Sequence, residues 1–146
     1  QVLVQFVAVG RAEVAMEGSG GLPKRIKDTT AMTEALTLGV KAGVDLATLA
    51  DVIANSSGGN RRLTEKFPRY LFKGNFEPGF ATALAAKDVR LATDLGREYG
   101  IPMELSNLVD QRHVEAMFRG WGPEDSDAVS KIQEEKAGVQ LRLLDV

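Results

Sequence analysis

Two lysines could carry chemistry in this sequence, and Lys87 is the more informative of them. Apolar residues recur at helical spacing between Pro78 and Gly100, and Lys87 falls on a position that this spacing assigns to the inward face. The members of that stripe are Phe80, Leu84, Lys87, Leu91 and Leu95. Burying an ammonium group is costly unless it is paired. Lys87 is therefore predicted either to reach water at the rim of the helix or to point into a cleft between apolar helices.

Lys24 is the second candidate. It follows Gly18 and Gly20 at the start of a predicted helix, where the helix dipole disfavours a cation but favours contact with an anion. Arg25 and Lys27 lie in the same turn, so a solvated basic turn is the alternative interpretation.

Two further sites are open to more than one interpretation. The loop over residues 55–60 contains Ser56, Ser57 and Gly58, which could hydrogen-bond a carboxylate or a hydroxy acid. An ordinary connection between two helices explains the same residues. The single histidine, His113, lies among charged neighbours and is expected at the surface rather than as a catalytic base.

These residues would be positioned by helices. Helical spacing and stop signals predict helices over 24–42, 78–100 and 102–119, and a weaker segment over 63–72. Asp45 is predicted to cap another helix that ends at the loop over 55–60, and Asp125 or Ser126 to cap the last helix, with Val129 and Ile132 buried. Residues 1–17 suit an extended lead-in. The expected fold is all-α, a multi-helix bundle with a short extended N-terminal segment.

Composition excludes several classes of function. The 146 residues carry a net charge of −2 with acids and bases interspersed, which disfavours nucleic acid as a partner. Cysteine is absent and there is one histidine, so we expect no metal site. No apolar run is long enough to span a bilayer, and the first ten residues lack the pattern of a signal peptide. We therefore expect no membrane contact, and a location in the cytoplasm or the mitochondrial matrix.

Several motifs together resemble one enzyme family. They are Gly18, Gly20 and Lys24; Glu34, Ala35 and Leu36 with Gly43 and Asp45; Ser56, Ser57 and Gly58; Phe76, Pro78, Phe80, Leu84, Lys87, Asp88 and Leu91; and Gly120, Gly122, Asp125 and Ser126. From about residue 18 to residue 138 the chain resembles the C-terminal helical domain of the β-hydroxyacid dehydrogenase family. That family includes 3-hydroxyisobutyrate, tartronate semialdehyde and threonate dehydrogenases and is related to 6-phosphogluconate dehydrogenase.

The resemblance implies a fold, a cofactor and a set of site residues. Residues 18–146 would be a substrate-binding and dimerisation domain of the 6-phosphogluconate dehydrogenase C-terminal type, and residues 1–17 a lead-in or the remnant of a preceding domain. NAD or NADP would be bound mainly by a domain that is not in this chain. Lys24 would be the catalytic acid/base and Lys87 a cofactor contact. The implied substrate-binding residues are Gly18, Gly20, Lys27, Asp28, Ser56, Ser57 and Gly58.

The sequence departs from the family in two places. Lys27 and Asp28 stand where the family has asparagine, and fewer residues separate Lys24 from Glu34 than in the family. The implied enzyme is a homodimer or higher homo-oligomer that transfers hydride between the nicotinamide and a small 3-hydroxy acid or its semialdehyde. The alternatives are a non-catalytic helical dimerisation module and a reductase of imines or other substrates on the same scaffold.

Overall fold

The fold is helical throughout the part of the chain that the structure describes. The computed structural model describes residues 22–143, and the side chains of residues 24–143. The elements in chain order are α2 (Leu22–Lys41), α3 (Leu46–Ala54), the π-helical turn η1 (Arg62–Lys66), the 3₁₀ turn η2 (Leu71–Lys73), α4 (Thr82–Glu98), α5 (Glu104–Phe118), the 3₁₀ turn η3 (Ser126–Val129) and α6 (Ser130–Ala137). Residues 22–143 contain no β-strand, only an isolated bridge between Ala81 and Asp125. The all-α prediction is confirmed; the predicted extended segment over 1–17 lies outside the described residues.

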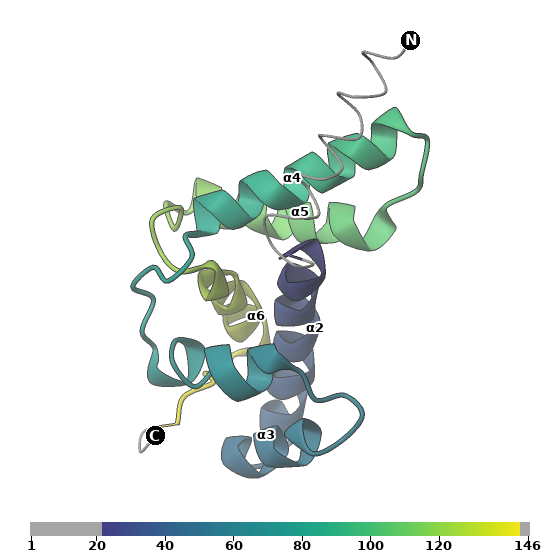
Figure 1. Cartoon of the computed structure of the whole chain (residues 1–146). Helices are drawn as coiled ribbons and strands as arrows, with labels where there is room; N and C mark the ends of the chain where they lie inside the picture. The colour runs from purple at the N-terminus through teal and green to yellow at the C-terminus, as the bar shows by residue number, and fades with distance from the viewer. Residues whose placement is uncertain (1–21, 144–146) are drawn as a thin grey trace.

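Helix α2 is the central element (Figure 1). It contacts α3, α4, α5 and α6, so the remaining helices are arranged around it. Helices α4 and α5 pack side by side across one end of α2, whereas α3 lies at its other end. The largest apolar cluster lies between α2, α3 and the segment with η1 and η2; its buried members include Met32, Leu36, Leu46, Leu63, Phe67, Leu71 and Phe72.

Local sequence signals explain most helix ends. The side chain of Asp45 accepts a hydrogen bond from the backbone N–H of Thr48 at 2.9 Å, so it caps α3 as predicted. Gly43 ends the turn after α2 with φ of 91°, which favours glycine. The predicted start of a helix at Pro78 is wrong, because α4 begins at Thr82. The backbone N–H of Thr82 donates to the carbonyl of Glu124 at 2.7 Å, and this contact fixes the helix start against a distant loop.

The predicted inward stripe of α4 is also wrong. Leu84 is 48% exposed and Leu91 is 39% exposed. The buried residues of α4 are small or medium-sized: Thr82, Ala85, Ala86, Val89, Thr93 and Gly96. Their size lets neighbouring helices approach closely; a Cβ atom on Gly96 would lie 2.4 Å from Cγ of Met103. Close packing therefore selects the small-residue face over the leucine face.

Candidate functional site

A cleft of about 710 Å³ lies between the start of α2 and the segment over residues 60–80. Cationic side chains dominate its lining: Lys24, Arg25, Arg61, Arg62, Lys66 and Arg69. The other lining residues are Asp28, Glu65, Asn60, Tyr70, Gly79 and Phe80. This composition suits an anionic ligand, since a cleft lined by one sign of charge concentrates ions of the other sign.

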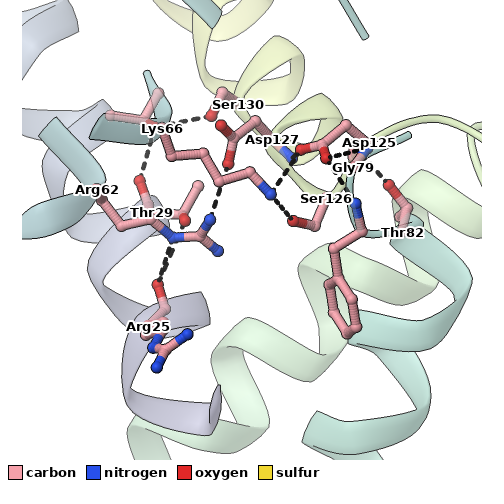
Figure 2. A network of polar contacts seen from close by, with 12 residues as sticks. Arg25, Thr29, Arg62, Lys66, Gly79, Thr82, Asp125, Ser126, Asp127 and Ser130 are labelled. Atoms are coloured by element: carbon pink, nitrogen blue, oxygen red, sulfur yellow. Dashed lines mark hydrogen bonds and ion pairs between the residues drawn. The ribbon is translucent and has the colours of Figure 1, made fainter. Parts of the chain in front are cut away.

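Lys66 is held in the cleft wall by two acceptors from η3. Its Nζ lies 2.9 Å from Oδ1 of Asp125 and donates to Oγ of Ser126 at 3.0 Å (Figure 2). Asp125 is fully buried and well satisfied, because its Oδ2 also accepts from the backbone N–H groups of Gly79 and Phe80 at 3.1 Å and 3.0 Å. The wall is thus tied to η3 through one carboxylate.

Arg62 is the other anchored cation, at the opposite end of η1. Its Nε donates to the backbone carbonyl of Arg25 at 3.2 Å, and its Nη1 lies 3.5 Å from Oδ1 of Asp127 (Figure 2). Neither carboxylate oxygen of Asp127 accepts a hydrogen bond from another described residue, and Asp127 is fully buried. Burial raises the pKa of Asp127 to about 6, although the charge of Arg62 lowers it.

Lys24 and Asp28 are the predicted site residues that the structure brings together in the cleft. Nζ of Lys24 lies 2.9 Å from Oδ2 of Asp28, one turn later on α2. The Lys24 side chain is 76% exposed, so its ammonium group lies at the mouth of the cleft. Lys27 points elsewhere: its Nζ donates to Oγ of Ser106 on α5 at 3.3 Å.

The other predicted site residues are not among those that line the cleft. Lys87 lies on α4 with 62% of its side chain exposed, and its Nζ is 3.3 Å from Oδ1 of Asp88. Ser56, Ser57 and Gly58 are exposed after α3, where Oγ of Ser56 donates to the carbonyl of Ile53 and accepts from the N–H of Gly58. Gly18 and Gly20 lie outside the described residues.

The prediction for His113 is wrong. The side chain is fully buried rather than at the surface, with Nδ1 2.9 Å from the carbonyl of Val109 and Nε2 unpartnered. Burial lowers the pKa of His113. Arg112 and Glu115 are partly buried and Asp110 is buried one turn earlier on α5, so charged neighbours in the sequence did not indicate that this part of the helix faces inward.

Sequence reasoning missed the pair of cations on η1. The available signal was two cations at i and i+4, Arg62 and Lys66, flanking the buried Leu63. Their carboxylate partners are about sixty positions away in the chain, as the separation between Lys66 and Ser126 illustrates. Nothing local in the sequence connects them.

Within residues 22–143 there is no group of three His, Asp or Glu side chains that could hold a metal ion. Likewise, among the helices that the structure describes, none has the length and hydropathy to cross a bilayer.

Comparison with known proteins places the cleft in a family context. Residues 27–133 match the family described as the NAD-binding domain of NADP-dependent 3-hydroxyisobutyrate dehydrogenase. The chain belongs to this family. The resemblance predicted from the motifs is thereby confirmed, and the matched range includes all of η1 and η3 but begins after Lys24.

Two curated relatives and one solved structure illustrate the similarity within the 3-hydroxyisobutyrate dehydrogenase-like family. The chain is 34% identical over 110 residues to a 2-(hydroxymethyl)glutarate dehydrogenase of Eubacterium barkeri, a match that covers 75% of this chain and 36% of the relative. It is 35% identical over 102 residues to an L-threonate dehydrogenase of Cupriavidus necator, covering 70% and 34%.

A 3-hydroxyisobutyrate dehydrogenase of Mycobacterium tuberculosis, solved with L-serine, has a TM-score of 0.69 at 25% identity over 77% of this chain and 40% of its own. The chain thus spans only about a third of the length of the curated relatives that it matches.

Proposed function

We infer that the chain is the substrate-binding helical part of an NAD(P)-dependent dehydrogenase for a small 3-hydroxy acid or its semialdehyde. The observation that carries this proposal is the family match over residues 27–133, which includes the whole cationic cleft wall over residues 60–80. A hydroxy acid is anionic at neutral pH, so the excess of lysine and arginine in the cleft suits it.

Lys24 is the proposed acid/base. When bound, the nicotinamide accepts a hydride from the hydroxyl-bearing carbon, or donates one to the carbonyl carbon in the reverse direction. Lys24 would take the hydroxyl proton during oxidation and donate a proton to the carbonyl oxygen during reduction. Its position at the mouth of the cleft supports this role, because the ammonium group is accessible to a substrate there.

Lys87 is the proposed cofactor contact. Its ammonium group is exposed on α4, so it fits an interaction with an anionic or polar group of NAD or NADP. The phosphates of a dinucleotide usually lie at a glycine-rich turn between a strand and a helix. Since residues 22–143 hold no strand, that turn would come from outside them. Lys87 therefore fits a supporting contact rather than the main cofactor cradle.

The remaining predicted residues are proposed to orient the substrate. Asp28 supports this by lining the cleft beside Lys24. Ser56, Ser57, Gly58 and Lys27 do not line this cleft, so they are proposed to contact parts of the substrate that extend beyond it, and Gly18 and Gly20 complete the proposed set.

The role of Lys24 is tested by Lys24→Ala in the full-length enzyme. We expect turnover to be abolished while the thermal unfolding midpoint stays nearly unchanged, because the only ion pair of Lys24 in the described residues is exposed. Lys41→Ala is the matched control, since Lys41 is an exposed lysine on the same helix outside the cleft. Normal turnover of the Lys24 variant contradicts the assignment.

Self-association is a compatible second role. Exposed apolar side chains gather on two adjacent helices: Leu84 and Leu91 on α4, and Leu105, Leu108 and Phe118 on α5. Exposed apolar patches often mark sites of protein–protein interaction. A homodimer or higher homo-oligomer working in the cytoplasm is therefore part of the proposal, and sedimentation of the wild-type enzyme measures its oligomeric state.

A further inference from the structure

The cleft carries more positive charge than its own acids can neutralise. Six of its lining residues are cations and two are acids. The two acids are already paired, Asp28 with Lys24 and Glu65 with Arg61, at 2.9 Å and 2.8 Å. Arg62 and Lys66 are paired from behind the wall by Asp127 and Asp125, which do not line the cleft.

Two cations of the cleft remain without such a partner. Within the part of the chain that the structure describes, the guanidinium groups of Arg25 and Arg69 make no ion pair. Among the described lining residues and the two aspartates behind them, six cations thus face four carboxylates, which leaves two positive charges. A ligand with a single carboxylate would neutralise one of them and leave the other.

Arg62 and Lys66 are preorganised to receive part of such a ligand. Arg62 is only 8% exposed, and Lys66 has 19% of its side chain exposed. An arginine has five N–H donors, and within the described residues Arg62 uses Nε on the Arg25 carbonyl and places Nη1 beside Asp127. Lys66 uses two of its three donors on Asp125 and Ser126. Arg62 thus retains donors while its position is fixed, and Lys66 retains one donor with its Nζ 5.1 Å from the ring centroid of Tyr70, another residue that lines the cleft.

The backbone between the two cations supports the same conclusion. Residues 62–66 form a π-helical turn, in which the N–H of Phe67 donates to the carbonyl of Arg62 at 2.8 Å. Such turns are rare and occur frequently at functional sites. Here the turn keeps Leu63 and Phe67 in the apolar core while Arg62 and Lys66 line the cleft.

We propose that Arg62 and Lys66 bind a second anionic group of the substrate, so that the acid taken by this cleft carries two negative charges, as a dicarboxylate does. The inference rests on the proposed function, because the reacting hydroxy acid supplies the first carboxylate. Arg62 holds the second group through its free guanidinium donors, Lys66 adds a charge-assisted hydrogen bond, and Arg25 and Arg69 at the rim balance the remaining charge. The phosphates of a dinucleotide are the competing occupant.

The experiment is calorimetric titration of the wild-type chain with glutarate and with valerate, which have five carbons but two carboxylates and one. We expect glutarate to bind at least tenfold more tightly than valerate at low ionic strength. Equal affinities for the two acids overturn the proposal.

Variants then locate the site. The double variant Arg62→Gln/Asp127→Asn removes the cation and its buried carboxylate together, so no unpaired charge is left inside. We expect it to lose at least tenfold in glutarate affinity, with valerate affinity unchanged and the fold verified by circular dichroism. Arg69 is exposed, so Arg69→Gln should not disturb folding. We expect this variant to weaken glutarate binding severalfold. Lys73→Gln removes the same charge outside the cleft; an equal loss there contradicts a specific site.

Competition and turnover separate the remaining outcomes. If inorganic pyrophosphate displaces glutarate at a concentration below the dissociation constant of glutarate, Arg62 and Lys66 bind the cofactor phosphates and the proposal fails. Binding of glutarate by a full-length protein without dehydrogenase activity would refute the proposed function but keep the anion site. Turnover of singly charged hydroxy acids only, without glutarate binding, would refute the anion site and keep the function.

Discussion

Two buried carboxylates lie behind the cleft wall, Asp125 and Asp127, and they differ in the number of hydrogen bonds that they accept. Both are fully buried, and both pair with a cation on η1. Asp125 accepts from three backbone N–H groups, those of Gly79, Phe80 and Asp127, and from Lys66. Within residues 22–143, no group donates a hydrogen bond to either oxygen of Asp127, and the cation paired with it, Arg62, lies 3.5 Å away.

The difference shows what hydrogen bonds do for a buried charge. Donors that surround Asp125 replace the hydrogen bonds to water that it has lost, so the carboxylate can hold the loop over residues 76–80. Among the described residues, the charges of Arg62 and Lys66 lower the pKa of Asp127. Desolvation by burial outweighs them and raises this pKa to about 6. One carboxylate stabilises structure, and the other is poised to change its charge near neutral pH.

The largest effect is expected from Asp125→Asn. The N–H₂ group of the asparagine must face either the N–H groups of Gly79 and Phe80 or Lys66 and the N–H of Asp127, so two of the four contacts are lost, and the ion pair is lost in either case. Removing one partner of a buried pair costs roughly 3–5 kcal/mol of unfolding free energy, which urea denaturation measures. Glu65→Gln is the control, because Glu65 pairs with a cation in the same cleft but is exposed. A loss no larger than that of the control contradicts the anchoring role of Asp125.

Asp127→Asn is expected to change the pH dependence of stability. The folded-state pKa is raised from 3.8 to about 6, so in wild type the folded state holds a proton that the unfolded state has lost between these two values. The contribution of Asp127 to the free energy of unfolding is therefore fully present below pH 3.8 and is lost as the pH rises through about 6. The variant keeps a neutral side chain at all pH values. Its stability relative to wild type should rise by up to about 3 kcal/mol between pH 4 and pH 7.

Asp45→Asn is expected to change the pH dependence of stability in the opposite direction to Asp127→Asn, because the pKa of Asp45 is lowered and not raised. Hydrogen bonds from Thr48 at the start of α3 hold the pKa of Asp45 below its usual value of 3.8. The contribution of Asp45 is present above pH 3.8 and is lost as pH falls through the folded-state pKa, so this variant should lose its disadvantage in acid. Denaturation curves at several pH values check both slopes. A flat difference between Asp127→Asn and wild type shows that Asp127 does not titrate in this range.

Local signals explain what the sequence could predict. The cap at Asp45 follows from a side chain that reaches a backbone N–H three residues later. Asp125 also caps, but it caps the 3₁₀ turn η3 that leads into α6, whereas the predicted cap was on the last helix itself. Val129 and Ile132 are three positions apart, which puts them on one face of a helix, and this spacing predicts their burial. The all-α fold follows from the same kind of evidence.

Tertiary contacts explain what the sequence could not predict. The burial of α4 residues depends on how closely its neighbours approach, and no pattern within the helix shows that small side chains will face inward in place of Leu84 and Leu91. The cationic wall depends on pairing between residues on η1 and η3, far apart in the chain. Lys24 could be predicted from its place at the start of a helix and from the family motif, and Asp28 from its position in that motif; the ion pair between them was not predicted.

The smallest expected effect comes from Gly79→Ala, which tests how Asp125 reaches its donors. A Cβ atom on Gly79 would lie 2.0 Å from Oη of Tyr70 and 3.5 Å from Oδ2 of Asp125, so Tyr70 must move or the loop must shift away from the carboxylate. Such crowding costs about 1–3 kcal/mol, measurable by urea denaturation. If the loop shifts, the bond from the Gly79 N–H to Asp125 weakens, and Asp125 comes to resemble Asp127. Combining Gly79→Ala with Asp125→Asn should then cost less than the sum of the two single changes, because both act on the same hydrogen bond. Strict additivity would mean that the crowding is absorbed by Tyr70 alone and that the satisfied carboxylate does not depend on the close approach of this glycine.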